Sequence, residues 1–162
     1  MKLSEPHSNP DVRIISLGAG VQSTVMALMA AKGELDPMPD CAIFADTGYE
    51  PQGVYDHLEW LEKQLPFPTY RVSSGNIKSD IQKGVNTTGL RFVAMPFFTK
   101  EGGMGMRQCT NEYKIVPLKK KTRELLGLKP RQRAKNQVSE TWLGISWDEM
   151  QRMKESRDKF IY

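Results

Sequence analysis

The sequence of 162 residues has few of the residues that build disulfide or metal scaffolds, and it has no long apolar run. It contains only two cysteines, Cys41 and Cys109, and two histidines. Two cysteines can make neither a disulfide framework nor a four-ligand zinc site, so we expect reduced thiols. No stretch approaches the roughly 18 apolar residues that cross a bilayer, and the N-terminus lacks the apolar core of a secretion signal. We therefore predict a cytoplasmic protein with no membrane partner.

The length and the distribution of charge constrain the architecture and the ligands. A chain of this length fits one domain, 1–162, with a core that needs no disulfide or metal. Residues 1–90 carry 7 Lys and Arg against 11 Asp and Glu, whereas residues 91–162 carry 16 against 8. A basic C-terminal half favours anionic ligands such as phosphate, sulfate or nucleic acid, and a solvated basic face is the alternative.

Short apolar runs alternate with helical patterns along the chain. We predict strands at 12–17, 41–46, 69–73 and 141–145. We predict helices at 23–32 and 54–65, a weak helix within 74–90, and a basic helix from Pro117 to Leu126 that Gly127 ends. This order predicts an α/β fold with an open, mainly parallel twisted sheet and helices on both faces. Ligands of such sheets bind at the carboxyl ends of the strands.

Two further local signals concern the second half of the chain. Ser146 and Glu149 have the spacing of a capping box, which predicts a final helix. The glycine-rich stretch 101–106 is expected to be a mobile loop. The chain ends soon after the final helix should begin, so we expect that a C-terminal extension could follow Tyr162.

The segment 18–24, Gly-Ala-Gly-Val-Gln-Ser-Thr, lies between the first predicted strand and the first predicted helix. Glycines let the backbone approach an anion closely, and the N–H groups that begin a helix point toward it. The segment has neither the Gly-Lys-Ser/Thr ending of a Walker loop nor the third glycine of a dinucleotide fingerprint. We therefore predict a phosphate-binding loop of another class.

This segment resembles the Ser-Gly-Gly-x-Asp-Ser-Thr loop of the PP-loop ATP pyrophosphatases, also called adenine nucleotide α-hydrolases. It departs from that pattern at Gly18, Ala19 and Gln22, the last of which replaces a carboxylate. Three later segments resemble, in the same order, motifs of the phosphoadenosine phosphosulfate (PAPS) reductases and their relatives. They are Phe-Ala-Asp-Thr-Gly-Tyr-Glu-Pro at 44–51, the stretch from Cys109 to Leu118, and 144–149 together with Arg152.

The resemblance implies a set of site residues. ATP or PAPS would bind with Mg²⁺ at Asp46, Lys114 and Arg152 would offset charge at the reacting phosphate, and Cys109 could act as a nucleophile. The alternatives are a turn cap at Asp46, solvated side chains at Lys114 and Arg152, and an inert thiol at Cys109. Arg107 is a weaker anion-binding candidate. The expected nucleotide contacts are Ser16, Gly18, Ala19, Gly20, Val21, Gln22, Ser23, Thr24, Asp46, Thr47, Gly48 and Gly144.

Three functions follow from this resemblance. We expect first an enzyme that cleaves or transfers at the α-phosphate of ATP. The second candidate is a PAPS reductase or sulfotransferase-like enzyme that uses an external thiol, since no cysteine follows Cys109 and no iron–sulfur cluster is expected. The third is a non-catalytic nucleotide-binding subunit of a nucleic-acid-modifying complex, with the basic region 114–135 contacting phosphates. The sequence leaves the acceptor open and selects no mode of homo-oligomerisation.

Overall fold

Four parallel strands form the single sheet of this computed structural model, which describes residues 8–90, 100, 102, 109–153, 156, 158, 160 and 161. The order across the sheet is β3-β2-β1-β4. The prediction of an open parallel α/β sheet is confirmed. Three of the predicted strands have the predicted bounds, and the fourth begins two residues earlier than predicted. The strands are β1 (Val12–Leu17), β2 (Cys41–Asp46), β3 (Thr69–Ser73) and β4 (Ser139–Leu143).

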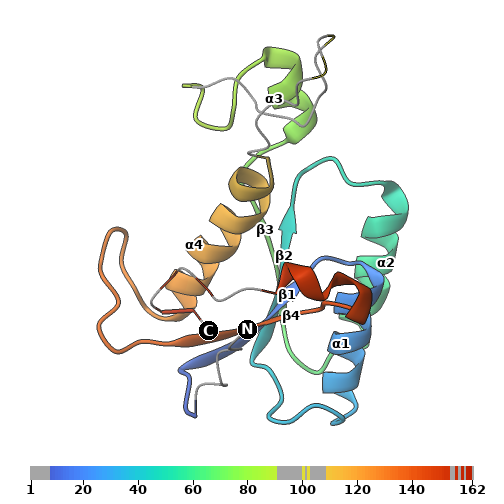
Figure 1. The fold of residues 1–162 in the computed structure, drawn as a ribbon, viewed down its shortest axis with the longest axis vertical. Helices are drawn as coiled ribbons and strands as arrows, with labels where there is room; N and C mark the ends of the chain where they lie inside the picture. Colours follow the sequence, from blue (N-terminus) through green and yellow to red (C-terminus); the bar gives the residue numbers. More distant parts are fainter. Residues whose placement is uncertain are drawn as a thin grey trace.

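Helices cover both faces of the sheet (Figure 1). The helices α1 (Val21–Ala31) and α2 (Gln52–Glu62) lie on one face, and α4 (Val116–Leu125) lies on the other. The short helix α3 (Ile77–Lys83) stands away from the sheet beyond its upper edge in Figure 1. The central strands β1 and β2 are largely buried on both sides because each side meets a helical layer, whereas the edge strands β3 and β4 are only partly buried.

Alternate residues of the strands supply the two halves of the core. On one face, Ile15, Leu17 and Phe44 pack with the buried Ala27, Leu58 and Leu61 of α1 and α2. On the other face, Ile14, Cys41 and Ile43 pack with Leu118 and Leu125 of α4. Because successive side chains of a strand point to opposite faces, one short run such as 12–17 contributes to both clusters.

A π-helical turn, Thr110–Ile115, leads directly into α4 and was not predicted. Its Tyr113 is 1% exposed, and the phenol donates a hydrogen bond of 2.6 Å to Asp80 Oδ2 in α3. Burial and the nearby Asp80 raise the pKa of this phenol well above its ordinary value. Turns of this kind are often found at functional sites, and this one carries Lys114 one residue after Tyr113.

The final helix and the glycine-rich loop predicted for the second half of the chain are not confirmed as predicted. The predicted final helix is a 3₁₀-helix, Trp147–Arg152, and the predicted serine cap is wrong, because the Ser146 side chain makes no cap hydrogen bond to that helix. The predicted loop 101–106 lies outside the described residues except for Gly102, and Arg107 also lies outside them. Within the described ranges, no helix has the length and apolar character that a bilayer span requires.

The connections of the sheet locate its ligand-binding edge. From β1 the chain proceeds through α1 to β2 and through α2 to β3, then returns over the other face through α4 to β4, beside β1. The order of the strands therefore reverses between the neighbouring strands β1 and β4: α1 follows β1 on one face of the sheet, and α4 leads to β4 from the other. The crevice at the carboxyl ends of two such strands is the usual ligand site of open α/β sheets. Here that position is occupied by the loop 18–20 and by Gly144.

Candidate functional site

The loop 18–20 joins β1 to α1 in a strained conformation. Ala19 has φ 53°, a left-handed value that costs an L-residue other than glycine about 1–2 kcal/mol. Gly20 is extended and precedes the helix without a side-chain cap. Backbone strain of this kind is concentrated at functional sites, where the surrounding structure enforces it. The loop therefore has a fixed shape that the sequence motif alone did not reveal.

Ser23 holds this loop closed from within. Its Oγ accepts a hydrogen bond of 3.2 Å from the Gly18 backbone N–H and donates one of 3.2 Å to the Gly20 carbonyl oxygen. The Ser23 side chain is buried, and so is that of Thr24, whose hydroxyl lies 2.9 Å from His57 Nε2 in α2. Ser23 and Thr24 were predicted to contact nucleotide, and that stays a prediction for their backbone. In the structure their hydroxyls shape the loop and fix α1 against α2.

Two backbone N–H groups at the beginning of α1 make no hydrogen bond to another described residue. Thr24 N–H donates to the Gly20 carbonyl, whereas the N–H groups of Val21 and Gln22 have no acceptor within the described part of the chain. The Val21 side chain is 76% exposed, so the beginning of this helix is open to solvent. Unpaired N–H groups at the positive end of a helix bind phosphate without a charged side chain.

Gly144 brings the end of β4 against this helix start. A Cβ atom at Gly144 would lie 2.7 Å from both the backbone carbon of Gln22 and the backbone nitrogen of Ser23. Real Cβ contacts are not that short, so only glycine permits the approach. Beside it, Gln22 Nε2 donates to Ser146 Oγ at 3.4 Å. Two segments more than 120 residues apart thus form one wall of the site.

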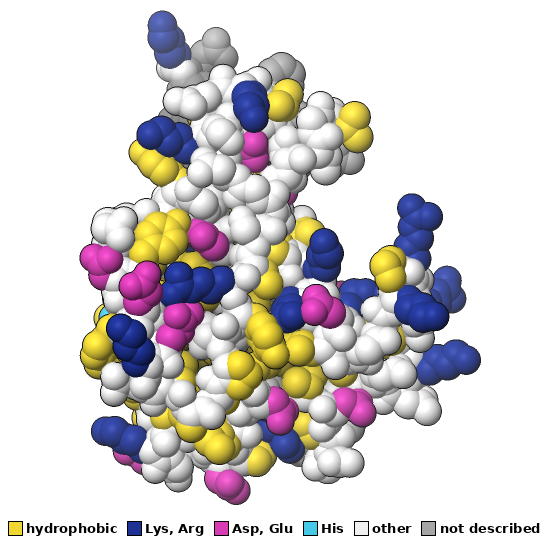
Figure 2. Space-filling view, turned by 180° about the vertical axis from the view of Figure 1, so that it is seen from behind, with side chains coloured by type: hydrophobic (Ala, Val, Ile, Leu, Met, Phe, Trp, Pro, Cys, Tyr) yellow, Lys and Arg dark blue, Asp and Glu magenta, His cyan; other side chains and the backbone are white. Residues whose placement is uncertain are grey.

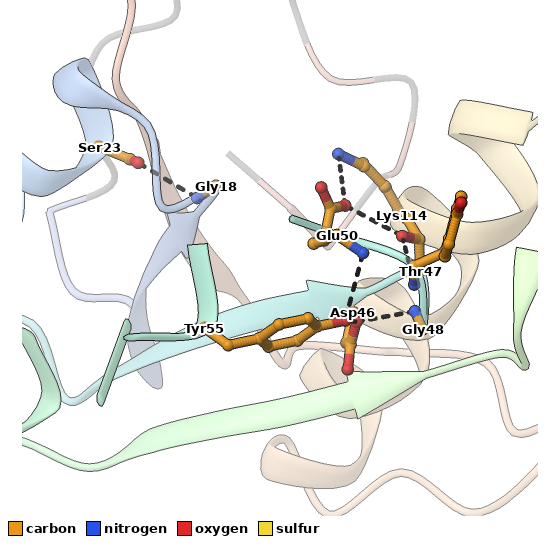
Figure 3. Close-up of polar contacts among 9 residues, drawn as sticks. Gly18, Ser23, Asp46, Thr47, Gly48, Glu50, Tyr55 and Lys114 are labelled. Atoms are coloured by element: carbon orange, nitrogen blue, oxygen red, sulfur yellow. Dashed lines mark hydrogen bonds and ion pairs between the residues drawn. The ribbon is translucent and has the colours of Figure 1, made fainter. Parts of the chain in front are cut away.

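The end of β2 carries a second polar turn, shown in Figure 3. Asp46 Oδ1 accepts hydrogen bonds from the Gly48 backbone N–H at 2.7 Å and from the Tyr55 hydroxyl at 2.9 Å. Gly48 has φ 71°, and its carbonyl accepts a hydrogen bond of 2.6 Å from Asn76 Nδ2. Asp46 therefore caps the turn, as the alternative interpretation had it. The described residues hold no cluster of three or more metal-ligating side chains, and the metal role of Asp46 stays a prediction.

Glu50 links this turn to Lys114. Its Oε1 accepts a hydrogen bond of 3.0 Å from the Thr47 hydroxyl and lies 3.6 Å from Lys114 Nζ (Figure 3). The Glu50 backbone N–H donates to the Tyr55 hydroxyl at 3.3 Å, and burial raises the pKa of that phenol. The sequence did not identify Glu50 or Tyr55, although Glu50 lies inside the motif 44–51. The only feature of the sequence that could have identified Glu50 was an acidic residue four positions after Asp46.

A cleft of about 290 Å³ opens beside this ion pair, at the carboxyl ends of β1, β2 and β4. Its lining is mainly apolar, with a few polar groups, as in most small-molecule sites. One of these is Thr141 Oγ1, which is buried and has no hydrogen-bond partner among the described residues. The lining of the cleft includes Ser16, Leu17, Lys114, Ile115, Leu118, Thr141 and Leu143.

The predicted site residues are only partly brought together. The loop 18–24, Gly144, Ser16 and Lys114 gather at one edge, with Asp46, Thr47 and Gly48 at the neighbouring strand end. Cys109 precedes the π-helical turn, half-buried and with a free thiol. Arg152 ends the 3₁₀-helix, and its side chain lies outside the described parts of the structure, as does Arg107.

Comparison with known proteins adds no relative. No family model matches the sequence, and searches of the curated proteins and of the solved structures return no match.

Proposed function

We propose that this chain binds an adenine nucleotide, with the phosphates at the loop 18–22 and the nucleoside in the cleft beside β1 and β4. The observation that carries the proposal is the open start of α1, whose N–H groups at Val21 and Gln22 lack acceptors among the described residues. This helix start lies at the point of the sheet where ligands of α/β proteins bind. The cleft that shares Ser16, Leu17 and Gly18 with this strand and loop supports the same placement.

Each part of the site suits one part of a nucleotide. The side chains of Leu17, Ile115, Leu118 and Leu143 offer an apolar surface to a base, and the unpartnered Thr141 hydroxyl offers it a hydrogen bond. Lys114 Nζ lies at the rim, and its side chain is 52% exposed. A cation at that place offsets negative charge on phosphate oxygens. The resemblance to the PP-loop family is what specifies adenine.

The reaction that we propose is cleavage or transfer at the α-phosphate of ATP. Phosphoryl and nucleotidyl transfer require little covalent chemistry from the protein, because positioning and charge stabilisation supply most of the catalysis. Lys114 would stabilise the developing charge, and the loop N–H groups would hold the leaving pyrophosphate.

The Mg²⁺ that accompanies ATP would be held by its phosphates and by Asp46, which uses only Oδ1 for its two hydrogen bonds. Mg²⁺ commonly binds through one or two carboxylates together with substrate phosphates and water, so a single carboxylate fits the group. Gln22, where the family loop has Asp, provides no second carboxylate.

A second candidate substrate is PAPS, and one observation favours it. The thiol of Cys109 is half-buried rather than enclosed, and it lies five residues before Lys114 at the beginning of the same π-helical turn. Cys41, by contrast, is 2% exposed within β2. Among the described cysteines, only Cys109 is accessible to a thiol partner.

Calorimetry with the full chain and Mg²⁺ tests binding, and product analysis tests the reaction. We expect ATP to bind more tightly than GTP and to release pyrophosphate in the presence of Mg²⁺. Release of adenosine bisphosphate from PAPS with thioredoxin would instead favour the second candidate. Binding of ATP without any product would identify a nucleotide-binding subunit. If ATP and PAPS both fail to bind a folded wild-type protein, the proposed function is wrong.

A further inference from the structure

The connection between α4 and β4 carries the largest group of unpaired cations on the described surface. Four residues of this basic loop, 129–135, are exposed Lys or Arg, and Lys120 of α4 is exposed nearby. None of the five has an acidic partner among the described residues. Figure 2 shows dark blue side chains gathered on the side of the molecule that carries this connection. The cations are Lys120, Lys129, Arg131, Arg133 and Lys135.

Hydrogen bonds from Arg123 of α4, and one beyond the loop at Val138, anchor the basic loop. Arg123 of α4 donates through Nη2 to the carbonyl oxygens of Lys129 and Gln132, and its guanidinium lies 5.7 Å from the centre of the Phe160 ring. At the far end, Asp11 Oδ2 accepts from the Val138 backbone N–H at 2.7 Å. These anchors lower the entropic cost of presenting the loop cations to a partner.

Three other cations of the region 114–135 contact residues of the protein itself or line the cleft. Lys119 pairs with Asp158 at 2.7 Å, and Lys121 pairs with Glu124 at 2.7 Å and lies 4.2 Å from the centre of the Tyr70 ring. Lys114 belongs to the nucleotide cleft. The basic region that looks continuous in sequence is therefore divided between the cleft, the ion-paired lysines of α4, and the basic loop.

We propose that the basic loop, together with Lys120, binds the phosphate backbone of a nucleic acid. The loop contains Arg, whose planar guanidinium matches phosphate oxygens with two hydrogen bonds, and the exposed amide side chain of Gln132 lies between Arg131 and Arg133. No acidic residue occurs between 125 and 139. A hollow of about 730 Å³ beside Arg123, Arg131 and Arg133 gives a phosphate backbone room to lie against the loop, and the one acidic residue in its lining, Asp158, is paired with Lys119.

The composition of this surface argues against the other polyanions. An anionic membrane would need apolar side chains to insert beside the cations. None of the exposed large apolar residues of the described structure lies between 126 and 138. The loop itself has no aromatic residue for stacking on unpaired bases, and the one aromatic side chain that lines the adjoining hollow, Phe160, already has the Arg123 guanidinium 5.7 Å from its ring centre. This composition favours backbone contacts to a duplex over single-strand binding.

Fluorescence anisotropy with the full chain tests this proposal. The probes are a labelled 20-base-pair DNA duplex and a labelled RNA hairpin, titrated at several salt concentrations. The variant R131Q/R133Q/K135Q removes three loop cations, and K32Q/K63Q/K83Q removes three exposed cations from the opposite, acidic half of the chain. We expect the loop variant to lose at least about tenfold in affinity and its salt slope to fall by about 2–3, because each lost phosphate contact is worth about 0.9. The control variant should stay within about twofold of wild type.

Several outcomes would overturn the proposal. These are no binding of either nucleic acid by wild type, or equal losses of affinity in the two variants. Preference for the duplex DNA or for the RNA hairpin would specify the partner. ATP calorimetry on the same samples separates the two proposals, because the loop variant should retain the wild-type response to ATP whatever that response is.

Discussion

Gly144, at the end of β4, lies so close to Ser23, at the start of α1, that a Cβ atom would come within 2.7 Å of the Ser23 backbone nitrogen. This contact joins the end of β4 to the helix that follows β1, and the order of the strands reverses between β1 and β4. It also fixes the position of the helix whose first N–H groups face the proposed phosphate site. The geometry of the site therefore requires that residue 144 have no Cβ atom.

The substitution Gly144→Ala should disturb this contact. The added methyl group cannot avoid backbone atoms, so we expect the start of α1 to shift, ATP affinity to fall at least about tenfold, and the free energy of unfolding to fall by about 1–3 kcal/mol, as in overpacked interiors. Calorimetry and urea unfolding measure the two effects. Gly53→Ala is the matched control, because a Cβ there meets nothing within 4 Å. Equal behaviour of the two variants would contradict the role of Gly144.

Ala19 gives a prediction about strain. Because its φ of 53° suits glycine better than alanine, Ala19→Gly should leave the free energy of unfolding unchanged or raise it by up to about 1 kcal/mol, after the entropic cost of a more flexible unfolded chain. The same substitution at Ala31, in the last turn of α1, should lower it by about 0.5–1 kcal/mol. Urea unfolding of both variants measures the difference. Similar destabilisation by both would show that the loop is not strained.

Lys114 and Glu50 should act in opposite directions on nucleotide affinity. Loss of a charge-assisted hydrogen bond costs about 1.5–3 kcal/mol, so Lys114→Gln should weaken ATP binding by about 10- to 100-fold. Glu50→Gln keeps an acceptor for Thr47 but removes a negative charge 3.6 Å from Lys114 Nζ, and we expect binding to tighten a few-fold.

Calorimetry of both variants and of the double variant measures the coupling between Lys114 and Glu50. The exposed Lys83→Gln is the control for loss of charge alone. If Lys83→Gln weakened binding as much as Lys114→Gln, the effect of Lys114 would be one of net charge and not of position.

Cys41 predicts how stability depends on alkaline pH. Burial in β2, with a smaller contribution from Asp40, raises the pKa of the Cys41 thiol from 9.0 to about 11. Between these two values the unfolded chain has released the proton and the folded chain has kept it. The stabilisation is thus fully present below about pH 9 and is lost as the pH rises toward 11, by about 1.4 kcal/mol per pH unit.

Urea unfolding at pH 8, 9, 10 and 10.5 measures this slope. Cys41→Ala should lower stability at every pH but should flatten the alkaline slope relative to wild type. Cys109→Ala, at the half-buried cysteine, should leave the slope as it is. An unchanged slope in Cys41→Ala would assign the alkaline dependence to other groups.

The sequence by itself determined the local elements. The strands at 12–17, 41–46 and 69–73 were predicted with their observed bounds. The first two are short apolar runs that end in turn residues, a pattern that specifies buried strands without reference to the rest of the chain. The third is a short β-rich run with polar residues, and it forms a partly exposed edge strand. The strand-loop-helix at 12–32 was predicted for the same reason. Its helix begins two residues earlier than predicted, after the extended Gly20.

Only the tertiary structure decided how these elements combine. The insertion of β4 beside β1 gives Gly144 its contact with α1, and the position of the π-helical turn brings Lys114 to Glu50. The buried roles of Ser23 and Thr24 likewise depend on the closed loop and on α2. Local patterns report what each segment prefers, whereas these contacts join residues far apart along the chain, and only packing in three dimensions selects them.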